Sequence, residues 1–292
     1  NVGSNYARQV NTLIGTKGVG LTSGYLYPGA TYPYGMVQFT PSYFSKRSGF
    51  VINQLSGGGC EHMGNFPTFP VKGKLKMSPD NILNYRINIS EEKGHAGYYE
   101  AKVQEDIHAK LTVTERTGMA SYEYPADQQY GTVIIGGGIS ATPIEQAAIV
   151  ITAPNKCEGY AEGGNFCGLR TPYKVYFVAE FDTDALESGT WKRDELKPNT
   201  TFAEGEYSGV YFTFDVNKKK NIQYKIGVSY VSVENARENL KAENTGWDFL
   251  QIQNQAESKW NHYLGKIEVE GSNPDRTTQF YTHLYDCCTG LL

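Results

Sequence analysis

Short runs of apolar, β-branched and aromatic residues recur along most of the chain, and glycine, proline, asparagine or aspartate bounds each run. Such short runs are typical of β-strands, whereas an amphipathic helix repeats its apolar positions every three or four residues. The clearest runs lie at residues 99–103, 108–114, 120–124, 132–135, 147–152, 173–181, 209–216 and 222–231. Because no helical pattern separates them, we predict an all-β fold, a large antiparallel β-sandwich.

The N-terminal part of this sandwich is rich in turn formers. Residues 9–40 interleave short apolar pieces with glycine and proline and end in a predicted strand at 36–39. A further strand is predicted from residue 49, and it leads into three consecutive glycines at 57–59. Consecutive glycines permit positive φ and let backbone N–H groups approach a ligand closely.

The pattern changes near residue 233. From 233 to 264 the apolar positions follow helical spacing, and Gly246 is predicted to divide this stretch into two helices. A short strand is expected at 266–270 and the start of a further helix at 274–286.

The last predicted helix carries an apolar face, formed by Phe280, Tyr281, Leu284 and Tyr285. Nothing after it in the chain covers that face. We therefore expect a sandwich domain over residues 1–232, and over 233–292 a short helical linker with the start of a second, truncated domain.

Composition and charge narrow the range of partners. The formal net charge is −4, and the one basic run, at 218–220, lies between asparagines as in a solvated turn, so no nucleic-acid partner is expected. No apolar run approaches the roughly 20 residues needed to span a bilayer, so no membrane span is expected either. The 22 tyrosines and 32 glycines suit twisted strands and tight turns, and aromatic faces also pack on sugars.

The cysteines leave two alternatives open. Cys157 and Cys167 flank a glycine-rich stretch, and they can pair in an oxidising compartment or remain two free buried thiols. Cys287 and Cys288 are adjacent and can hardly bridge each other without strain.

Two further patterns bear on metal and acid–base chemistry. Asp182, Asp184 and Glu187 follow a predicted strand, but their spacing lacks the rest of a calcium loop, so we interpret them as an acidic turn. The five histidines show no H-x-x-x-H or H-E-x-x-H spacing, so no zinc site is expected.

Three collinear stretches carry a distinctive combination of motifs. The first joins V-N-T-L-I-G-T at 10–16 to P-G-A-T-Y-P-Y-G-M-V-Q-F-T-P at 28–41. The second is G-F at 49–50 with L-S-G-G-G-C at 55–60. The third runs from the sandwich into the linker and includes G-Y-Y at 97–99, N-F-C-G at 165–168 and G-W-D-F at 246–249. Through these motifs the chain resembles the N-terminal sandwich and linker of glycoside hydrolase family 92.

The resemblance implies a calcium-dependent, exo-acting α-mannosidase that inverts the anomeric centre. Members of this family join an N-terminal β-sandwich to a C-terminal (α/α)6 barrel, and the active site lies between the two domains. An inverting mechanism needs two carboxyl groups about 6.5–9.5 Å apart. The barrel supplies both of them and most of the calcium ligands, so the resemblance places no catalytic residue and no metal ligand in this chain. The implied partners are a mannose-containing glycan and the catalytic domain of the same polypeptide.

The sandwich is expected to supply one wall of the pocket, and the turn that contains the three glycines is the best candidate. The substrate-binding residues that we predict there are Gly58, Gly59, Cys60, Glu61 and His62. Cys60 is small enough to pack beside a sugar, and the Glu61 and His62 side chains can hydrogen-bond hydroxyl groups. The alternative is a plain turn between strands, whose glycines only satisfy backbone geometry.

Two departures from the family pattern leave the linkage specificity open. Asn53 and Gln54 stand where many members carry histidines, and a longer loop that bears a tryptophan is reduced here to residues 43–48. Within that loop, Lys46 and Arg47 can meet a substrate phosphate or serve only as surface charge. The substrate can thus be an α-1,2, α-1,3, α-1,4 or phosphate-substituted mannoside.

The sequence therefore predicts the N-terminal domain of a secreted α-mannosidase, located outside the cytoplasm in the periplasm or at the cell surface and inactive alone. One alternative is a stand-alone carbohydrate-binding module. The other is an assembly domain that self-associates through the apolar face at 280–285.

Overall fold

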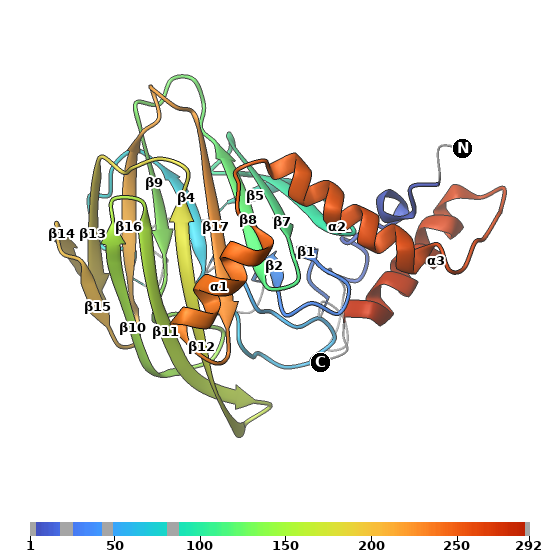
Figure 1. Cartoon of the computed structure of the whole chain (residues 1–292), viewed down its shortest axis with the longest axis horizontal. Helices are drawn as coiled ribbons and strands as arrows, with labels where there is room; N and C mark the ends of the chain where they lie inside the picture. Colours follow the sequence, from blue (N-terminus) through green and yellow to red (C-terminus); the bar gives the residue numbers. More distant parts are fainter. Residues whose placement is uncertain (1–3, 18–25, 43–48, 81–87, 290–292) are drawn as a thin grey trace.

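The computed structural model describes residues 4–17, 26–42, 49–80 and 88–289 of the chain. Two antiparallel sheets form a sandwich, and the helices α1, α2 and α3 follow them in the sequence (Figure 1). A short 3-10 helix, η1 (Tyr6–Gln9), precedes the first strand and lies near α2 and α3. The predicted sandwich followed by helices is thereby confirmed.

The first sheet has eight strands in the order β1-β2-β3-β4-β9-β16-β13-β14, and neighbours pair antiparallel. Its strands are β1 Ala30–Thr31, β2 Gln38–Pro41, β3 Phe50–Val51, β4 Thr68–Lys72, β9 Tyr130–Ile135, β13 Glu187–Lys192, β14 Glu195–Pro198 and β16 Ser208–Asp215. The strands nearest the N-terminus are very short, as the many glycines and prolines there predict.

The second sheet has nine strands in the order β15-β10-β11-β12-β17-β8-β7-β6-β5, again antiparallel throughout. Its strands are β5 Ile89–His95, β6 Tyr98–Val103, β7 Ile107–Val113, β8 Thr117–Glu123, β10 Ile144–Ala153, β11 Lys156–Phe166, β12 Leu169–Phe181, β15 Phe202–Glu204 and β17 Asn221–Ser229. The hairpin of β11 and β12 extends beyond the rest of this sheet (Figure 1).

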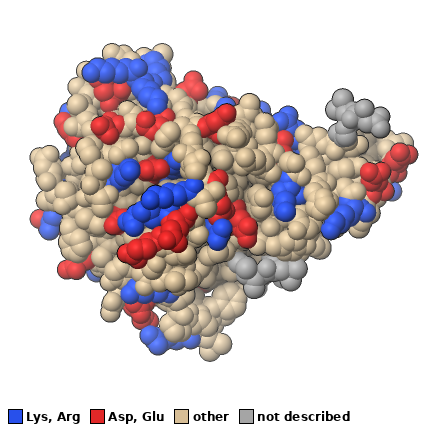
Figure 2. Space-filling view, in the orientation of Figure 1, with Lys and Arg blue, Asp and Glu red and all other residues tan. Residues whose placement is uncertain are grey.

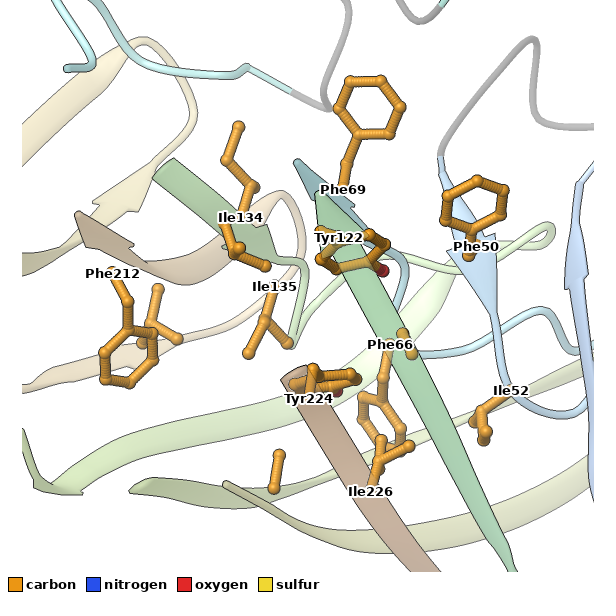
Figure 3. Packing of buried hydrophobic residues seen from close by; sticks show 14 of the residues in the cluster. Phe50, Ile52, Phe66, Phe69, Tyr122, Ile134, Ile135, Phe212, Tyr224 and Ile226 are labelled. Carbon is orange, nitrogen blue, oxygen red and sulfur yellow. The ribbon is translucent and has the colours of Figure 1, made fainter. Parts of the chain in front are cut away.

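The hydrophobic core lies between the sheets and is rich in aromatic rings (Figure 3). Phe50 of the first sheet lies 6.3 Å from Tyr122 of the second, and Phe181 of the second lies 5.0 Å from Phe212 of the first, measured between ring centroids. Each buried aromatic side chain contributes roughly 1.5–3 kcal/mol through removal of apolar surface from water. The alternating apolar positions of the sequence therefore face one another across the sandwich.

Helix α1 (Val233–Glu243) packs on the outer face of the second sheet. Its buried residues Ala236 and Leu240 contact Val178 of β12. At Gly227 of β17 a Cβ atom would lie 2.6 Å from the carbonyl oxygen of Ala236, so only glycine allows the helix to approach this closely.

Helix α2 (Phe249–Leu264) begins after Asp248, whose side chain accepts a hydrogen bond from the N–H of Gln251. The predicted division of the helical stretch at Gly246 is confirmed, since that residue lies between α1 and α2. Trp260 of α2 is fully buried, and its Nε1 donates to the carbonyl oxygen of Thr31 in β1 at 2.8 Å.

The strand predicted at 266–270 does not form, and the prediction was wrong there. The backbone here is irregular, and a side chain rather than a neighbouring strand forms hydrogen bonds with its N–H and carbonyl groups. The Tyr281 hydroxyl donates to the carbonyl oxygen of Ile267 at 3.1 Å and accepts from the N–H of Val269 at 3.2 Å.

Helix α3 (Pro274–Thr289) does not leave its apolar face uncovered, contrary to expectation. The covering residues precede the helix in the chain rather than follow it. Tyr281 lies 5.1 Å from Tyr6 of η1, and Tyr285 lies 4.5 Å from Trp260 of α2, both between ring centroids. Both tyrosines of α3 are buried, so the N-terminal segment and the helices share a second, smaller core.

The surface carries charges of both signs. On the face shown in Figure 2, lysine and arginine side chains are intermixed with aspartate and glutamate. Among the described residues, many charged side chains form ion pairs, such as Arg237 with Glu158 and Lys156 with Glu180. In the described part of the chain, no helix combines the length and the apolar character that crossing a membrane would require.

Candidate functional site

The predicted pocket wall is an irregular loop between β3 and β4, here called the glycine loop (residues 57–62). Gly57 and Gly59 have φ values of 78° and 75°, in the left-handed region that favours glycine. A Cβ atom at either position would meet nothing within 4 Å. The backbone therefore requires glycine at both positions, while the space beside them is open to a ligand.

Gly58 is constrained by a neighbour instead. A Cβ atom there would lie 2.7 Å from Cε1 of His62, so a side chain would displace the ring. The His62 side chain is buried, with Nδ1 2.6 Å from the carbonyl oxygen of Cys60 and Nε2 3.3 Å from the N–H of Leu55. Because the Leu55 N–H must donate, Nε2 is the acceptor and Nδ1 carries the proton.

The five predicted binding residues thus differ in their placement. Gly59 and Glu61 are exposed, Gly58 and Cys60 are partly exposed, and His62 is inside the loop. Both ring nitrogens of His62 are engaged within the loop, so its effect on a ligand is through the shape of the loop. The Glu61 carboxylate has no hydrogen-bond or ion-pair partner among the described residues. Substrate binding by these residues stays a prediction, and Glu61 is the side chain best placed to accept from a hydroxyl group.

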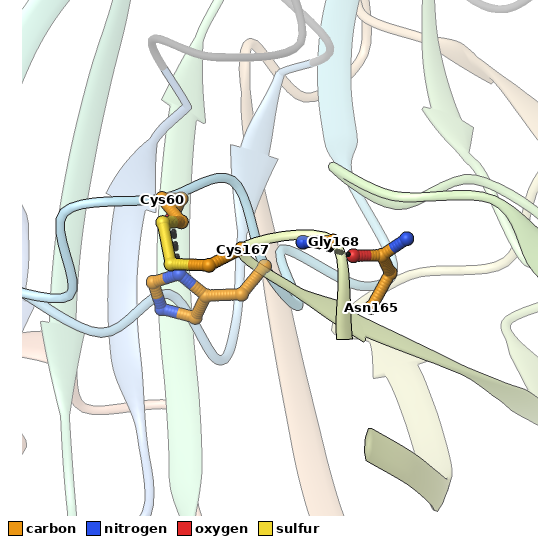
Figure 4. The surroundings of a disulfide bond; sticks show 5 residues. Cys60, Asn165, Cys167 and Gly168 are labelled. Carbon is orange, nitrogen blue, oxygen red and sulfur yellow. Dashed lines mark hydrogen bonds between the residues drawn. A yellow bond between two sulfur atoms is a disulfide. The ribbon is translucent and has the colours of Figure 1, made fainter. Parts of the chain in front are cut away.

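Cys60 forms a disulfide with Cys167, which lies 107 positions later, and their Cα atoms are 5.4 Å apart (Figure 4). Neither alternative for Cys157 and Cys167, a mutual bond or two free buried thiols, was right. Cys157 is a free thiol in the core of β11, and burial raises its pKa. Ten residues of extended strand separate two positions by roughly 33 Å, far beyond the reach of a disulfide.

Cys167 belongs to the tip of the β11–β12 hairpin, here called the hairpin tip (residues 165–170). Cys167 and Gly168 both have positive φ, 52° and 82°, which is the geometry of a two-residue hairpin turn. The N–H of Gly168 donates to Oδ1 of Asn165 at 2.9 Å (Figure 4). The rings of Phe166 and His62 pack edge to face, with 5.6 Å between ring centroids and an interplanar angle of 73°. A covalent bond and a ring contact therefore hold the hairpin tip against the glycine loop.

A buried amide network lies beneath the glycine loop. Asn53 accepts from the N–H of Asn65 at 2.7 Å and donates from Nδ2 to its Oδ1 at 3.0 Å. The Tyr173 hydroxyl donates to the same Oδ1 at 2.7 Å, and Nε2 of Gln54 donates to the carbonyl oxygen of His62 at 2.9 Å. Asn53 and Gln54 thus hold the loop from below. Sequence reasoning missed Asn65 and Tyr173, because only the tertiary structure brings them here.

The end of α3 lies beside the same region. The N–H of Tyr34 donates to the carbonyl oxygen of Cys288 at 3.4 Å, and a cavity of about 10 Å³ separates this contact from Gln54 and Leu55. Tyr34 has a φ of 55° and is 46% exposed. The segment at 31–38, the residues Gln54 and Leu55 that precede the glycine loop, and the end of α3 therefore line one small cavity. Residues 43–48, with Lys46 and Arg47, lie outside the described residues.

Two wider hollows lie elsewhere, along helix α2. One of about 720 Å³ is lined by Tyr32 and by polar side chains of α2, and one of about 390 Å³ continues toward Arg116 and Glu243. Neither includes the glycine loop. Where the structure describes it, the glycine loop is an open wall rather than a closed pocket.

Asp182 and Asp184 lie in the bend after β12, as interpreted from the sequence, whereas Glu187 is the first residue of strand β13. The Asp182 carboxylate accepts from the N–H of Gln223 at 3.1 Å and pairs with Lys219. Over the described residues, no three His, Cys, Asp or Glu side chains are grouped so that they could hold a metal ion.

Two family models match the sandwich and the helical segment of the chain in turn. The model of the glycosyl hydrolase family 92 N-terminal domain matches residues 9–229, and the model of the family's catalytic domain matches residues 235–290. An uncharacterized secreted glycosidase of Arthroderma benhamiae is 25% identical over 95% of this chain and 40% of its own length.

Solved structures show the same fold. The family GH92 inverting mannosidase BT2199 from Bacteroides thetaiotaomicron VPI-5482 is 25% identical, with a TM-score of 0.84 over 97% of this chain and 39% of that one. The GH92 α-mannosidase BT3965 from Bacteroides thetaiotaomicron is 23% identical, with the same TM-score over 98% of this chain and 41% of that one. The chain spans about 40% of the length of these relatives. Since the match to the N-terminal domain covers most of its residues, the chain belongs to glycosyl hydrolase family 92.

Proposed function

We propose that this chain forms the N-terminal part of a calcium-dependent exo-α-mannosidase that hydrolyses α-mannosidic bonds with inversion, and that the glycine loop is one wall of its substrate pocket. The observation that carries the proposal is the succession of two family matches, the N-terminal domain over 9–229 and the catalytic domain over 235–290. The helix in which the second match ends, α3, lies beside Tyr34 and lines a small cavity with Gln54 and Leu55, which precede the glycine loop. A solved relative that is named an inverting mannosidase supports the stereochemistry.

The catalytic acids are assigned to residues downstream of this chain. Inversion needs a general acid and a general base about 6.5–9.5 Å apart, with room for a water molecule between them. Among the described residues of the glycine loop and hairpin tip, Glu61 is the single carboxylate. One carboxylate cannot supply both roles, so the sandwich acts as scaffold and pocket wall.

Calcium does not fit the described residues alone. A calcium ion takes six to eight oxygen ligands, usually with several carboxylates among them. The glycine loop offers one free carboxylate, Glu61, and no described cluster supplies the others. The calcium dependence expected for the family therefore requires ligands from the catalytic domain, and we assign no step of the reaction to this ion.

An exported location is part of the proposal. The Cys60–Cys167 disulfide favours an oxidising compartment, because thiols stay reduced in most cytosols. The Arthroderma benhamiae relative is named a secreted glycosidase. A mannose-containing glycan outside the cytoplasm is the partner that fits both observations.

The test compares this 292-residue chain with a version extended through the catalytic domain, on a panel of α-mannobiosides with calcium or with EDTA. We expect hydrolysis only by the extended version, its loss in EDTA, and release of β-mannose as the first product by NMR. Activity of the short chain would contradict the assignment of the acids to the downstream domain, and Glu61→Gln would then be the first substitution to measure. An inactive extended version would refute the mannosidase proposal.

One alternative remains for the isolated chain. A carbohydrate-binding module would bind mannosides in the millimolar range or better without hydrolysis. Assembly through the apolar face of α3 has lost its main support, because Tyr281 and Tyr285 of that face are buried against the chain's own N-terminal segment and α2. Mannoside titration of the short chain by NMR distinguishes a binding module from a scaffold.

A further inference from the structure

The β11–β12 hairpin meets the connection between β3 and β4 at two levels. At its tip, Cys167 is bonded to Cys60 of the glycine loop (Figure 4). Further down the hairpin, the Tyr173 hydroxyl of β12 donates to Oδ1 of Asn65, which follows the loop in the chain, at 2.7 Å. Strands β3 and β4 belong to the first sheet and β11 and β12 to the second, so both contacts join one sheet to the other.

Hydrogen bonds close the base of the glycine loop. The N–H of Ile52 donates to the carbonyl oxygen of Asn65 at 3.2 Å, and Nδ2 of Asn53 donates to Oδ1 of Asn65 at 3.0 Å. Both asparagines are almost fully buried, where water cannot replace a lost donor without cost. Oδ1 of Asn65 thus accepts one bond from its own connection and one from Tyr173, and the second bond attaches the base of the loop to the hairpin.

The hairpin holds Tyr173 in a fixed position. Its ring packs against the hydrophobic core, and burial raises the pKa of its hydroxyl group, which therefore stays protonated and donates at neutral pH. Tyr173 pairs with Gly163 of β11, and the strand register shifts between this pair and the tip. At Gly164, inside this bulge, a Cβ atom would lie 2.0 Å from the carbonyl oxygen of Thr171. Only glycine allows this approach, so the bend between the two contacts is built into the hairpin.

We propose that Tyr173 is a positioning residue for the substrate pocket, and that the β11–β12 hairpin acts through Tyr173 and Cys167 as a brace that fixes the glycine loop. This inference rests on the proposed mannosidase function, in which the glycine loop is one wall of the pocket. A loose wall must be ordered each time a ligand binds, and that ordering costs affinity. The substrate contacts the wall before and during the reaction, so loosening the wall raises KM and leaves kcat unchanged.

The brace itself is tested on the 292-residue chain by hydrogen–deuterium exchange. Tyr173→Phe removes the hydroxyl group and keeps the ring. We expect the amides of residues 55–65 to exchange about fivefold faster, the effect of one lost hydrogen bond on local opening. The matched control is Tyr224→Phe on β17, because the buried Tyr224 hydroxyl has no hydrogen-bond partner among the described residues. Unchanged exchange in Tyr173→Phe, or equal acceleration in the control, would overturn the brace.

The positioning role is tested on the polypeptide extended through the catalytic domain, with an α-mannobioside as substrate and below the melting temperature of every variant. Tyr173→Phe should raise KM about fivefold and change kcat by less than about twofold, and Cys60→Ser with Cys167→Ser should act in the same direction. Tyr224→Phe should leave both constants unchanged. A loss confined to kcat, or no change in KM, would refute the positioning role. If the unmodified extended polypeptide hydrolyses no mannoside, the proposed function fails, while the exchange experiment still decides whether the brace exists.

Discussion

The ammonium group of Lys225, on strand β17, lies 2.9 Å from the carbonyl oxygen of Asn244, at the end of helix α1. The same group also donates to the carbonyl oxygen of Gly246 at 3.2 Å, lies 3.1 Å from the Glu180 carboxylate, and sits 4.2 Å from the ring centroid of Trp247. Lys225 is almost fully buried. One cation thus joins the sandwich to the connection between α1 and α2.

Substitution of this cation should be costly. In Lys225→Met the Glu180 carboxylate loses its buried partner and two backbone carbonyls lose a donor, so we expect the free energy of unfolding to fall by about 3 kcal/mol. Chemical denaturation followed by fluorescence measures the change, and Lys241→Ala, an exposed lysine on α1, is the control. If both variants unfold at the same denaturant concentration as the unmodified chain, the anchoring role is wrong.

The disulfide between Cys60 and Cys167 should carry a large part of the stability of the sandwich. A bond between residues 107 positions apart reduces the conformational entropy of the unfolded chain. In the chain-entropy model this stabilises the folded state by about 4–5 kcal/mol. We expect Cys60→Ser with Cys167→Ser to lower the free energy of unfolding by up to this amount, and reductant to have the same effect on the unmodified chain. The Cys157→Ser variant should still lose stability when reductant is added, because Cys157 is not part of the disulfide. Non-reducing peptide mapping that joins Cys157 to Cys167 would refute the assignment.

The sandwich could be predicted from sequence because its evidence is local. The runs at 108–114, 120–124 and 222–231 became neighbouring strands of one sheet, and the helical spacing after 233 became α1 and α2. In these segments the periodicity of apolar residues and the burial agree, so no distant contact is needed to decide the structure.

The failures share a different cause, which is contact between distant segments. The strand expected at 266–270 does not form, and the Tyr281 hydroxyl donates to the carbonyl oxygen of Ile267 in this segment. The disulfide partner of Cys167 lies across the sandwich in the glycine loop. Strand β11 (Lys156–Phe166) and the turn at Cys167 and Gly168 were not predicted, because the glycines of this segment suggested a loop. The position of this turn against residues 57–62 could not be predicted either, since the two segments are far apart in the sequence.

Because Gly58 packs against His62, we expect substitutions at these two positions to be coupled in their effects on stability. Gly58→Ala places a methyl group where Cε1 of the His62 ring lies, 2.7 Å away, and overpacking of this kind costs roughly 1–3 kcal/mol. In a His62→Ala background the ring is gone, so the second substitution at Gly58 should add little. A double-mutant cycle in thermal denaturation measures this coupling. Additive effects would show that the ring does not occupy the space beside Gly58.

The carboxyl group of Asp286 should make the stability of the chain depend on pH. Burial on α3 raises its pKa to about 6, although the nearby His283 lowers it, whereas an unfolded aspartate titrates near pH 4. A raised pKa in the folded state means that the contribution of the protonated group is fully present below pH 4 and is lost as the pH rises through 6. Since the side chain is 23% exposed, we expect Asp286→Asn to be more stable than the unmodified chain by only about 1–2 kcal/mol at pH 8.

At pH 4 the same substitution should have a smaller stabilising effect, because the unmodified carboxyl group is then largely protonated in the folded chain. Urea denaturation of both proteins at pH 4, 6 and 8 gives the difference in the free energy of unfolding at each pH. A difference that stays constant over this range would show that the carboxylate is well solvated in the folded chain. A difference that grows between pH 4 and 8 would locate a buried negative charge at the end of α3, beside the region where Tyr34 contacts Cys288.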